Sequence, residues 1–395
     1  MPITRRKAQR AAPRTPSPEP SIEDDDPATI TKLPSRPRLY AKALSAASRN
    51  EDDIFVDPDA ETASTSSATS SKRSKSPVKR VVDLRSLGGG VYFRNLSPKA
   101  EALGPEGQTL FYDLSDMASG LGTIPKSLWD DNHHFRSELG REPHPSHFNV
   151  CHADMDGLYG DFASIKKIVE ESTRCDDELE PECEWNHAVH GRLLAHVFGS
   201  KRDGAVGFRS TMSDRIDPPW LPKHPSGLTG SRMFDFGCYV RGEDTTQARL
   251  TDTRQFWDPS VNSFNRPSLN RKLAAFLIET KTISRTEAEA RIQLGTCIWA
   301  QIERLKSMAR NSPAAQAVLK QMIFPLSYVN GARWTLMFAR IDSADYSQIV
   351  IHVTALQSET SNVVMAYRTM LMLRRLELFL SSTFCGWWDQ FLDKL

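Results

Sequence analysis

The chain has 395 residues, with 50 Lys and Arg against 49 Asp and Glu, and 39% of its residues are hydrophobic. This length is typical of one large domain with a tail, or of two or three domains at most. The formal net charge of +1 excludes attraction of the whole chain to nucleic acid or to a membrane surface, so any such attraction must come from a local patch. The sequence has no apolar run that approaches the roughly 20 residues of a membrane-spanning helix.

The N-terminal segment predicts a protein that is not exported. Its first residues carry charges and prolines where a secretory signal needs an apolar run. The six cysteines include no CxxC pair, and a chain of this length needs no disulfides in place of a core. A nuclear or cytoplasmic location, without membrane association, is therefore expected.

Residues 1–80 are rich in Ser, Thr, Pro and charges and poor in aromatics, so they cannot bury enough apolar area to offset the entropy of ordering. We expect a disordered tail here and one domain over residues 81–395. The basic run from Lys72 to Arg80 contains Ser76 followed by proline. Such a run is typical of a nuclear import signal, whose positive charge a phosphate on Ser76 would reduce. A solvated tail that no receptor binds is the alternative.

Large apolar residues return from Val81, among them Val91, Phe111 and Trp129, but glycines and prolines interrupt them, so irregular structure leading into the domain is expected here. Residues 130–155 hold five histidines and Cys151. Their spacing matches no common zinc-binding pattern, so a His-rich surface loop is favoured over a metal site.

The remaining sequence is more regular and predicts a helix, three strands, a second helix, three further strands and a last helix. Hydrophobic periodicity and turn residues place them at residues 184–198, 205–212, 232–241, 273–281, 287–311, 321–329, 333–341, 349–353 and 362–379. Ser284 and Glu287 have the spacing of a capping box for the second helix. The pair Asn330-Gly331 between two apolar runs predicts a hairpin. The apolar run 273–281 is typical of a strand buried on both faces.

One group of polar residues is not easily explained as structural. Asp235 lies in an apolar strand, and Glu279 and Lys281 lie at the charged end of the most hydrophobic strand. Residues i and i+2 of a strand project to the same face, so Glu279 and Lys281 point together. Charged groups at the rim of a buried strand are costly unless each has a partner, and a metal ion would supply one.

The expected metal is Mg²⁺, with Mn²⁺ as a substitute. Asp235 and Glu279 would give it two carboxylates, and the carbonyl of Thr280 and waters would fill the remaining oxygen positions. Such a site suits hydrolysis of a phosphodiester, because the metal polarises the phosphate and lowers the pKa of a bound water. Lys281 can then orient that water or stabilise charge in the transition state.

An Asp followed by Glu-x-Lys on the next strand resembles the PD-(D/E)XK nuclease superfamily. Several segments resemble more closely the fungal PD-(D/E)XK nuclease-like domain: WNHAVHGRLL (185–194), MFDFGCYV (233–240), IETK (278–281), QLGTCIWAQ (293–301), GARWTLMF (331–338) and the last helix before Trp387-Trp388. The resemblance covers about residue 87 to the C-terminus.

The resemblance implies a fold and a set of site residues. The fold is α/β (α+β), a restriction-endonuclease-like core in which helices flank a central mixed β-sheet. By position, Asp235 and Glu279 would be metal ligands and Lys281 the catalytic lysine. Gln293 resembles the glutamine that several branches place beside the site, and Glu184 is a candidate for an extra acidic contact.

The sequence departs from the superfamily pattern in two ways. The proline before the first acid is absent, and the long gap after Asp235 requires residues 242–271 to form an inserted loop between adjacent strands. This loop holds four arginines that could contact phosphates without reading sequence, although ordinary surface arginines are the alternative. They are Arg249, Arg254, Arg266 and Arg271.

The leading functional hypothesis is a Mg²⁺-dependent nuclease that acts on nucleic acid, with DNA placed ahead of RNA. The second is a catalytically inactive protein that keeps the fold and works as a nuclear nucleic-acid-binding or accessory protein, because fold alone does not settle function. The near-zero net charge and the lack of a sequence-reading motif favour this second hypothesis. Hydrolysis of a small phosphoester is a third.

Overall fold

The computed structural model describes residues 79–149, 155–199, 205–225, 227–228, 233–242, 248, 250, 260–282 and 285–395. The expected disorder of residues 1–80 therefore lies, apart from Lys79 and Arg80, outside the described residues. None of the described helices combines the length and the apolar character that crossing a membrane requires.

The centre of the domain is a seven-stranded sheet with the order β1, β11, β10, β9, β8, β7, β4. The strands are β1 (Val91–Asn95), β4 (Val206–Ser210), β7 (Phe236–Val240), β8 (Leu273–Lys281), β9 (Phe324–Asn330), β10 (Arg333–Ile341) and β11 (Ile349–Glu359). The pairs β1/β11 and β8/β9 are parallel and the other four are antiparallel. The sheet is mixed, as the resemblance to the nuclease-like domain implied.

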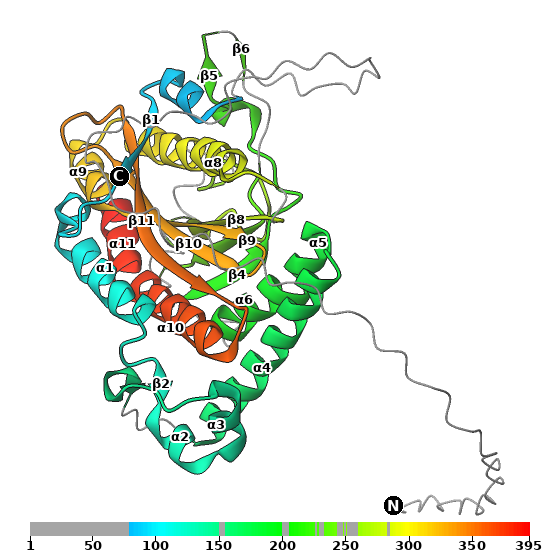
Figure 1. Ribbon diagram of the computed structural model, residues 1–395. Coiled ribbons are helices and arrows are strands. Elements are labelled where there is room, and N and C mark those ends of the chain that lie inside the picture. The colour runs from blue at the N-terminus through cyan, green and yellow to red at the C-terminus, as the bar shows by residue number, and fades with distance from the viewer. Residues whose placement is uncertain are drawn as a thin grey trace, which may run out of the picture. The chain divides into compact units, whose positions relative to one another are not determined.

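Helices flank both faces of this sheet. They are α1 (Gly104–Ala118), α2 (Lys126–Asp131), α3 (His133–Leu139), α4 (Met155–Asp177), α5 (Glu182–Trp185), α6 (Gly191–Phe198), α8 (Glu287–Met308), α9 (Pro313–Gln321), α10 (Val363–Phe379) and α11 (Cys385–Asp393). Helix α8 lies against β8 and β9, while α1 and α10 lie on the other side against β11 (Figure 1). Short strand pairs, β2 (Ile124–Pro125) with β3 (Phe148–Asn149) and β5 (Lys223–His224) with β6 (Gly227–Leu228), lie outside the main sheet.

Strand β8 carries most of the candidate site residues and runs through the core. Every residue from Leu273 to Thr280 is buried, which confirms the strand predicted to be covered on both faces. Each fully buried Phe, Leu or Ile side chain contributes roughly 1.5–3 kcal/mol through removal of apolar surface from water. Phe276, Leu277 and Ile278 therefore fix the position of the polar end that follows them.

The hairpin predicted at Asn330-Gly331 joins β9 to β10. Gly331 has a φ of +54°, in the left-handed region that glycine adopts without steric cost. Its N–H donates to the carbonyl of Lys281 at 2.9 Å, so the turn also closes the end of β8. The turn thus links three strands beside the candidate site.

The expectation of irregular structure between Val81 and Trp129 is wrong. This stretch forms a 3₁₀-helix (Val81–Ser86), β1, α1 and shorter elements. Strand β1 is only five residues long and pairs with the distant β11, so local periodicity does not reveal it. Pro105 lies in the first turn of α1, where its missing N–H costs nothing.

Three boundaries also differ from prediction. Helix α9 occupies Pro313–Gln321, and the hydroxyl of Ser312 caps it by accepting from the N–H of Ala315 at 3.1 Å. Strand β9 therefore begins at Phe324, later than the predicted start at residue 321. Strand β11 continues to Glu359, with alternating burial through its polar second half. Ser284 lies outside the described residues, and Thr286 caps α8 by accepting from the N–H of Glu289 at 3.4 Å.

Candidate active site

Asp235 immediately precedes β7, and its backbone is fixed to neighbours on both sides. Its N–H donates to the carbonyl of Ile278 on β8 at 3.0 Å, and its carbonyl accepts from the N–H of Thr211, just after β4, at 2.9 Å. The residue is only 6% exposed. Neighbouring strands therefore set the position of Asp235 before its side chain makes any contact.

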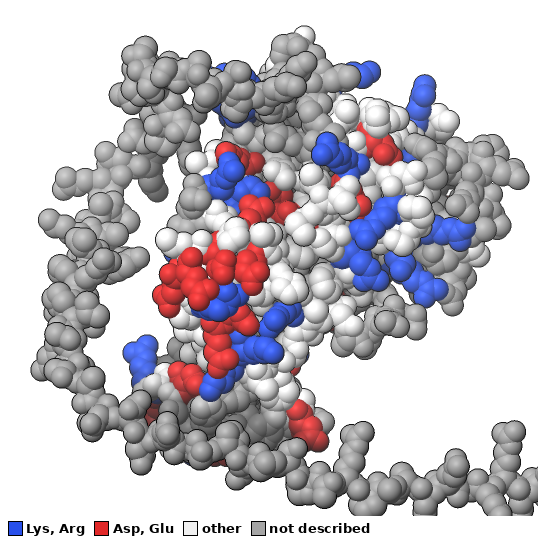
Figure 2. All heavy atoms as spheres, turned by 90° about the vertical axis from the view of Figure 1, so that its right-hand side faces the viewer, with Lys and Arg blue, Asp and Glu red and all other residues white. Residues whose placement is uncertain are grey.

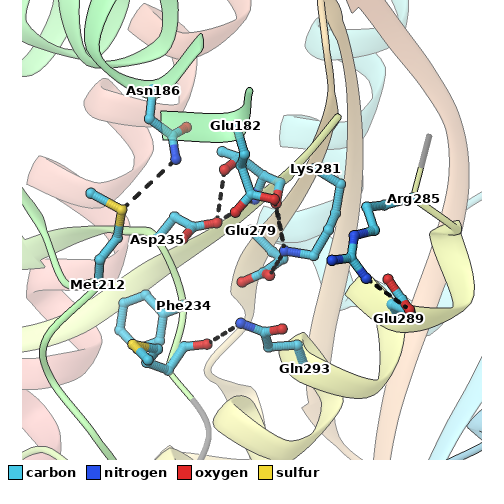
Figure 3. Close-up of polar contacts among 12 residues, drawn as sticks. Glu182, Asn186, Met212, Phe234, Asp235, Glu279, Lys281, Arg285, Glu289 and Gln293 are labelled. Carbon is cyan, nitrogen blue, oxygen red and sulfur yellow. Dashed lines mark hydrogen bonds and ion pairs between the residues drawn. The ribbon is translucent and has the colours of Figure 1, made fainter. Parts of the chain in front are cut away.

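The carboxylate of Asp235 is held against the end of β8 (Figure 3). Its Oδ2 atom accepts from both the backbone N–H and the hydroxyl of Thr280, each at 2.8 Å. Hydrogen bonds to a charged group contribute about 1.5–3 kcal/mol each. Asp235 and the Glu-x-Lys segment thus lie at the same end of adjacent strands.

Glu279 is a fully buried carboxylate. Its Oε1 atom accepts from the ammonium of Lys281, and its Oε2 atom has no hydrogen-bond partner among the residues that the structure describes. Burial raises the pKa of Glu279 well above its usual range, the charge of Asp235 raises it further, and Lys281 opposes both. A buried, half-satisfied carboxylate is costly in a folded protein, which makes Glu279 the clearest sign of a functional site.

The side chain of Lys281 is 11% exposed and points into this acidic group. Its Nζ atom donates to Glu279, to the carbonyl of Thr280 at 2.7 Å and to Oε2 of Glu182 at 3.5 Å. Burial alone would lower the pKa of Lys281, but the surrounding carboxylates, Glu279 foremost, raise it above its ordinary value. Lys281 is therefore held as an ammonium ion.

Helix α5 contributes the acid Glu182, which was not among the predicted site residues. Glu184, the expected candidate, instead forms an ion pair with Arg174 at 2.8 Å. The helix begins two residues earlier than predicted, and residues two apart on a helix point about 200° apart. Burial raises the pKa of Glu182, Lys281 lowers it, and Asp235 adds to the rise.

Gln293 lies on α8 and contacts the backbone that leads to Asp235. Its amide nitrogen donates to the carbonyl of Met233 at 2.6 Å. Figure 3 shows this bond beside the acidic group. In this structure Gln293 thus supports the chain next to Asp235, and its predicted catalytic role stays a prediction.

The residues present fit a divalent cation with oxygen ligands. Asp235 and Glu279 repel each other electrostatically, and Glu279 has an unpartnered buried oxygen, so a cation between them would relieve both costs. Across the ranges that the structure describes, no group of three or more His, Cys, Asp or Glu side chains is arranged to hold a metal ion. Two carboxylates and the Thr280 carbonyl remain the candidate ligand set.

The structure is a mixed α/β fold in which an acid and an acid-x-lysine pair lie at the ends of adjacent strands. The chain belongs to the PD-(D/E)XK nuclease superfamily, whose sequence model matches residues 130–385. Asp235, Glu279 and Lys281 all lie within the matched residues. Searches of curated proteins and of solved structures found no match.

Proposed function

We propose that the protein is a Mg²⁺-dependent nuclease that hydrolyses phosphodiester bonds, with DNA as the principal substrate and RNA as the second. The observation that carries this proposal is the convergence of Asp235, Glu279 and Lys281 at the ends of β7 and β8. Superfamily membership supports the reaction class and leaves the substrate open.

The residues have distinct proposed roles. Asp235, Glu279 and the Thr280 carbonyl hold Mg²⁺, which when bound polarises the phosphate and lowers the pKa of a water. Lys281, as an ammonium ion, stabilises negative charge that develops on the phosphate oxygens. Gln293 and the hydrogen bond from Thr211 keep Asp235 in place.

Basic side chains next to the site are proposed to contact the nucleic-acid backbone. Figure 2 shows the face on the right-hand side of Figure 1, where Lys and Arg gather on one part and Asp and Glu on another. Arg209 on β4 and Arg215 after it are exposed, and they flank Thr211, which bonds to Asp235. Contacts of this kind position a duplex without reading its sequence.

Glutamates from α4 to α5 gather around one arginine. Four glutamates surround Arg174 at 2.8–3.1 Å. They are Glu171, Glu178, Glu180 and Glu184. Their excess negative charge would repel a phosphate backbone, which favours its approach from the side of β4.

The four arginines expected in the inserted loop divide into two groups. Arg249 and Arg254 lie outside the described residues. Arg266 forms an ion pair with Asp214 at 2.8 Å and donates to the carbonyl of Ser210 at 2.9 Å. It therefore orders the loop after β4, and phosphate contact by Arg271 stays a prediction.

A catalytically inactive accessory protein is the second candidate, because the net charge of +1 gives the chain no overall attraction to nucleic acid. Under both hypotheses we propose a nuclear location for the protein, because the basic run that ends at Arg80 is typical of a nuclear import signal. Neutralising Lys72, Arg73, Lys79 and Arg80 in a fluorescent fusion should move it to the cytoplasm. An unchanged distribution would contradict this location.

A cleavage assay tests the nuclease proposal. Purified protein is incubated with supercoiled plasmid, single-stranded DNA and RNA in Mg²⁺, Mn²⁺ or EDTA. We expect metal-dependent cutting that Lys281→Met abolishes and Lys306→Met retains, since Lys306 pairs with Glu303 on α8, away from the site. Cutting by the Lys281→Met protein at the wild-type rate would contradict the proposal, and absence of cutting by the wild type would favour the accessory protein.

A further inference from the structure

His190 is a fully buried histidine whose two ring nitrogens both have polar neighbours. Nε2 lies 2.9 Å from the carbonyl oxygen of Gly331, and Nδ1 lies 3.0 Å from the side-chain oxygen of Asn186. Trp185 stacks on the ring and Trp334 meets it edge-on, with centroids 5.8 and 5.7 Å away. These aromatic neighbours and the two polar contacts fix the orientation of the ring.

The neighbours of His190 define where its proton lies. Burial lowers the pKa of His190 to about 4, so the ring is neutral and carries one N–H. The Gly331 carbonyl is part of the backbone and can only accept, so Nε2–H donates to it. Nδ1 is then an acceptor that faces Oδ1 of Asn186, while the amide nitrogen of Asn186 points to Sδ of Met212 at 3.9 Å. The bond from Nε2 to Gly331 is therefore the hydrogen bond that His190 donates.

Gly331 also bonds to Lys281, the lysine of the candidate site. Its own N–H donates to the carbonyl of Lys281 at 2.9 Å. The ring of His190 is thus joined to the backbone of Lys281 through one residue, whose φ of +54° directs its two polar groups.

His190 also belongs to the helical segment that carries the site's third acid. It ends a π-helical turn (Asn186–His190) that directly follows α5, and Glu182 lies on α5. Glu182 and Lys281 are themselves 3.5 Å apart. Single π-turns of this kind occur frequently at functional sites.

We propose that His190 is a positioning residue that fixes the helix bearing Glu182 against the strand end bearing Lys281, through Gly331. This inference rests on the proposed function for its consequence, because the orientation of Lys281 matters there to the reaction. His190 itself bonds to none of the site's carboxylates. Its action is therefore on geometry, and it should change turnover more than substrate binding.

Two substitutions separate the hydrogen bond from packing. Gln places an N–H close to the position of Nε2, whereas Asn reaches only as far as Nδ1. We expect His190→Asn to speed amide hydrogen exchange at Gly331 by about tenfold or more, because the local opening that exposes this amide becomes easier. His190→Gln should leave the exchange close to that of the wild type.

The same variants are assayed for cutting. We expect His190→Asn to lower kcat by about tenfold with little change in KM, as a misplaced group acting in the transition state does, and His190→Gln to restore it. His196→Asn is the control, because His196 bonds to Asp161 at 2.8 Å and should change stability without changing exchange at Gly331.

Each outcome decides the inference. Wild-type exchange and kcat in His190→Asn would overturn it, and so would equal damage from Asn and Gln, which would indicate packing alone. If His190→Asn does not fold, ¹⁵N shifts of the wild-type ring decide, since a proton on Nδ1 overturns the link to Gly331. Lack of cutting by the wild type would refute the proposed function, while the exchange data would still test His190.

Discussion

At the scale of single residues, the contrast between two buried acids shows which of them stabilises the fold. Asp161 accepts two hydrogen bonds from Arg374 and one from His196, and these partners outweigh burial to lower its pKa to about 2. Within the described part of the chain, Glu279 has one cationic partner and one oxygen without a hydrogen bond, and burial raises its pKa. Asp161 therefore contributes to stability, whereas ionised Glu279 opposes it.

This contrast predicts unequal effects of neutral substitutions. Glu279→Gln should lower the free energy of unfolding by less than Asp161→Asn does, because it removes a half-satisfied buried charge. It leaves Lys281 with Glu182 as a partner and should lower metal-dependent cutting by about 100-fold or more. Asp161→Asn, the matched control, should cost about 1–2 kcal/mol because it weakens the charge-assisted hydrogen bonds with Arg374, whose side chain is 38% exposed to solvent, and the folded fraction should still cut DNA. Urea unfolding and the plasmid assay measure the two effects. Destabilisation by Glu279→Gln as large as that by Asp161→Asn would show that Glu279 is a structural ion-pair residue.

At the scale of elements, local sequence patterns identified the strands that build the site. The apolar run of β8, the Asn-Gly turn and the alternation within Glu279-Thr280-Lys281 depend only on neighbouring residues, and all three appear in the structure. The pairing of β7 with β8 brings Asp235 to the Glu-x-Lys segment, as expected for adjacent strands.

Elements that depend on distant partners were missed. Strand β1 exists because it pairs with β11, which is more than 250 residues away in sequence. Glu182 lies before the predicted start of the helix at residue 184, so only Glu184 was a candidate. The two side chains point about 200° apart on the helix. The π-turn that contains His190 has no simple sequence pattern that would predict it.

The turn at Gly331 gives a prediction at this scale. Gly331→Ala should lower the free energy of unfolding by about 1 kcal/mol, because a side chain in the left-handed region is strained. Gly331→Asn should cost less, since Asn tolerates this conformation. Chemical denaturation measures both, and an Ala variant as stable as the wild type would contradict the assigned backbone geometry.

At the scale of the whole molecule, two buried histidines make stability depend on pH. Burial lowers the pKa values of His190 and His352 to about 4 from the model-compound value of 6.5. The unfolded chain binds these protons first, so their contribution is complete above pH 6.5 and is lost as the pH falls towards 4. Each contributes a slope of up to about 1.4 kcal/mol per pH unit in this window.

The test compares unfolding free energies of the wild type and His352→Gln between pH 7 and pH 4. We expect the variant to lose less stability than the wild type on acidification, because one of the two titrating groups is gone. Equal slopes for the two proteins would contradict the burial of a neutral His352.

Charge distribution gives a second prediction at this scale, since the net charge of +1 leaves binding to a local patch. Arg209→Ala and Arg215→Ala should each weaken DNA binding for all sequences and reduce the slope of log affinity against log salt by about 1. Arg310→Ala, at an exposed position after α8, is the control and should leave the slope unchanged. The affinities are measured in EDTA, and unchanged slopes in both Arg209 and Arg215 variants would place the substrate elsewhere.

The central claim is that Asp235 and Glu279 jointly hold one divalent cation, and Mn²⁺ binding tests it most directly. Titration of the full-length protein with Mn²⁺, followed by electron paramagnetic resonance of the free ion, should give one site that Asp235→Asn and Glu279→Gln each abolish. The account predicts that Asp161→Asn binds as the wild type does, because Asp161 pairs with Arg374. A wild-type protein that binds no Mn²⁺, or site variants that bind it unchanged, would contradict the claim.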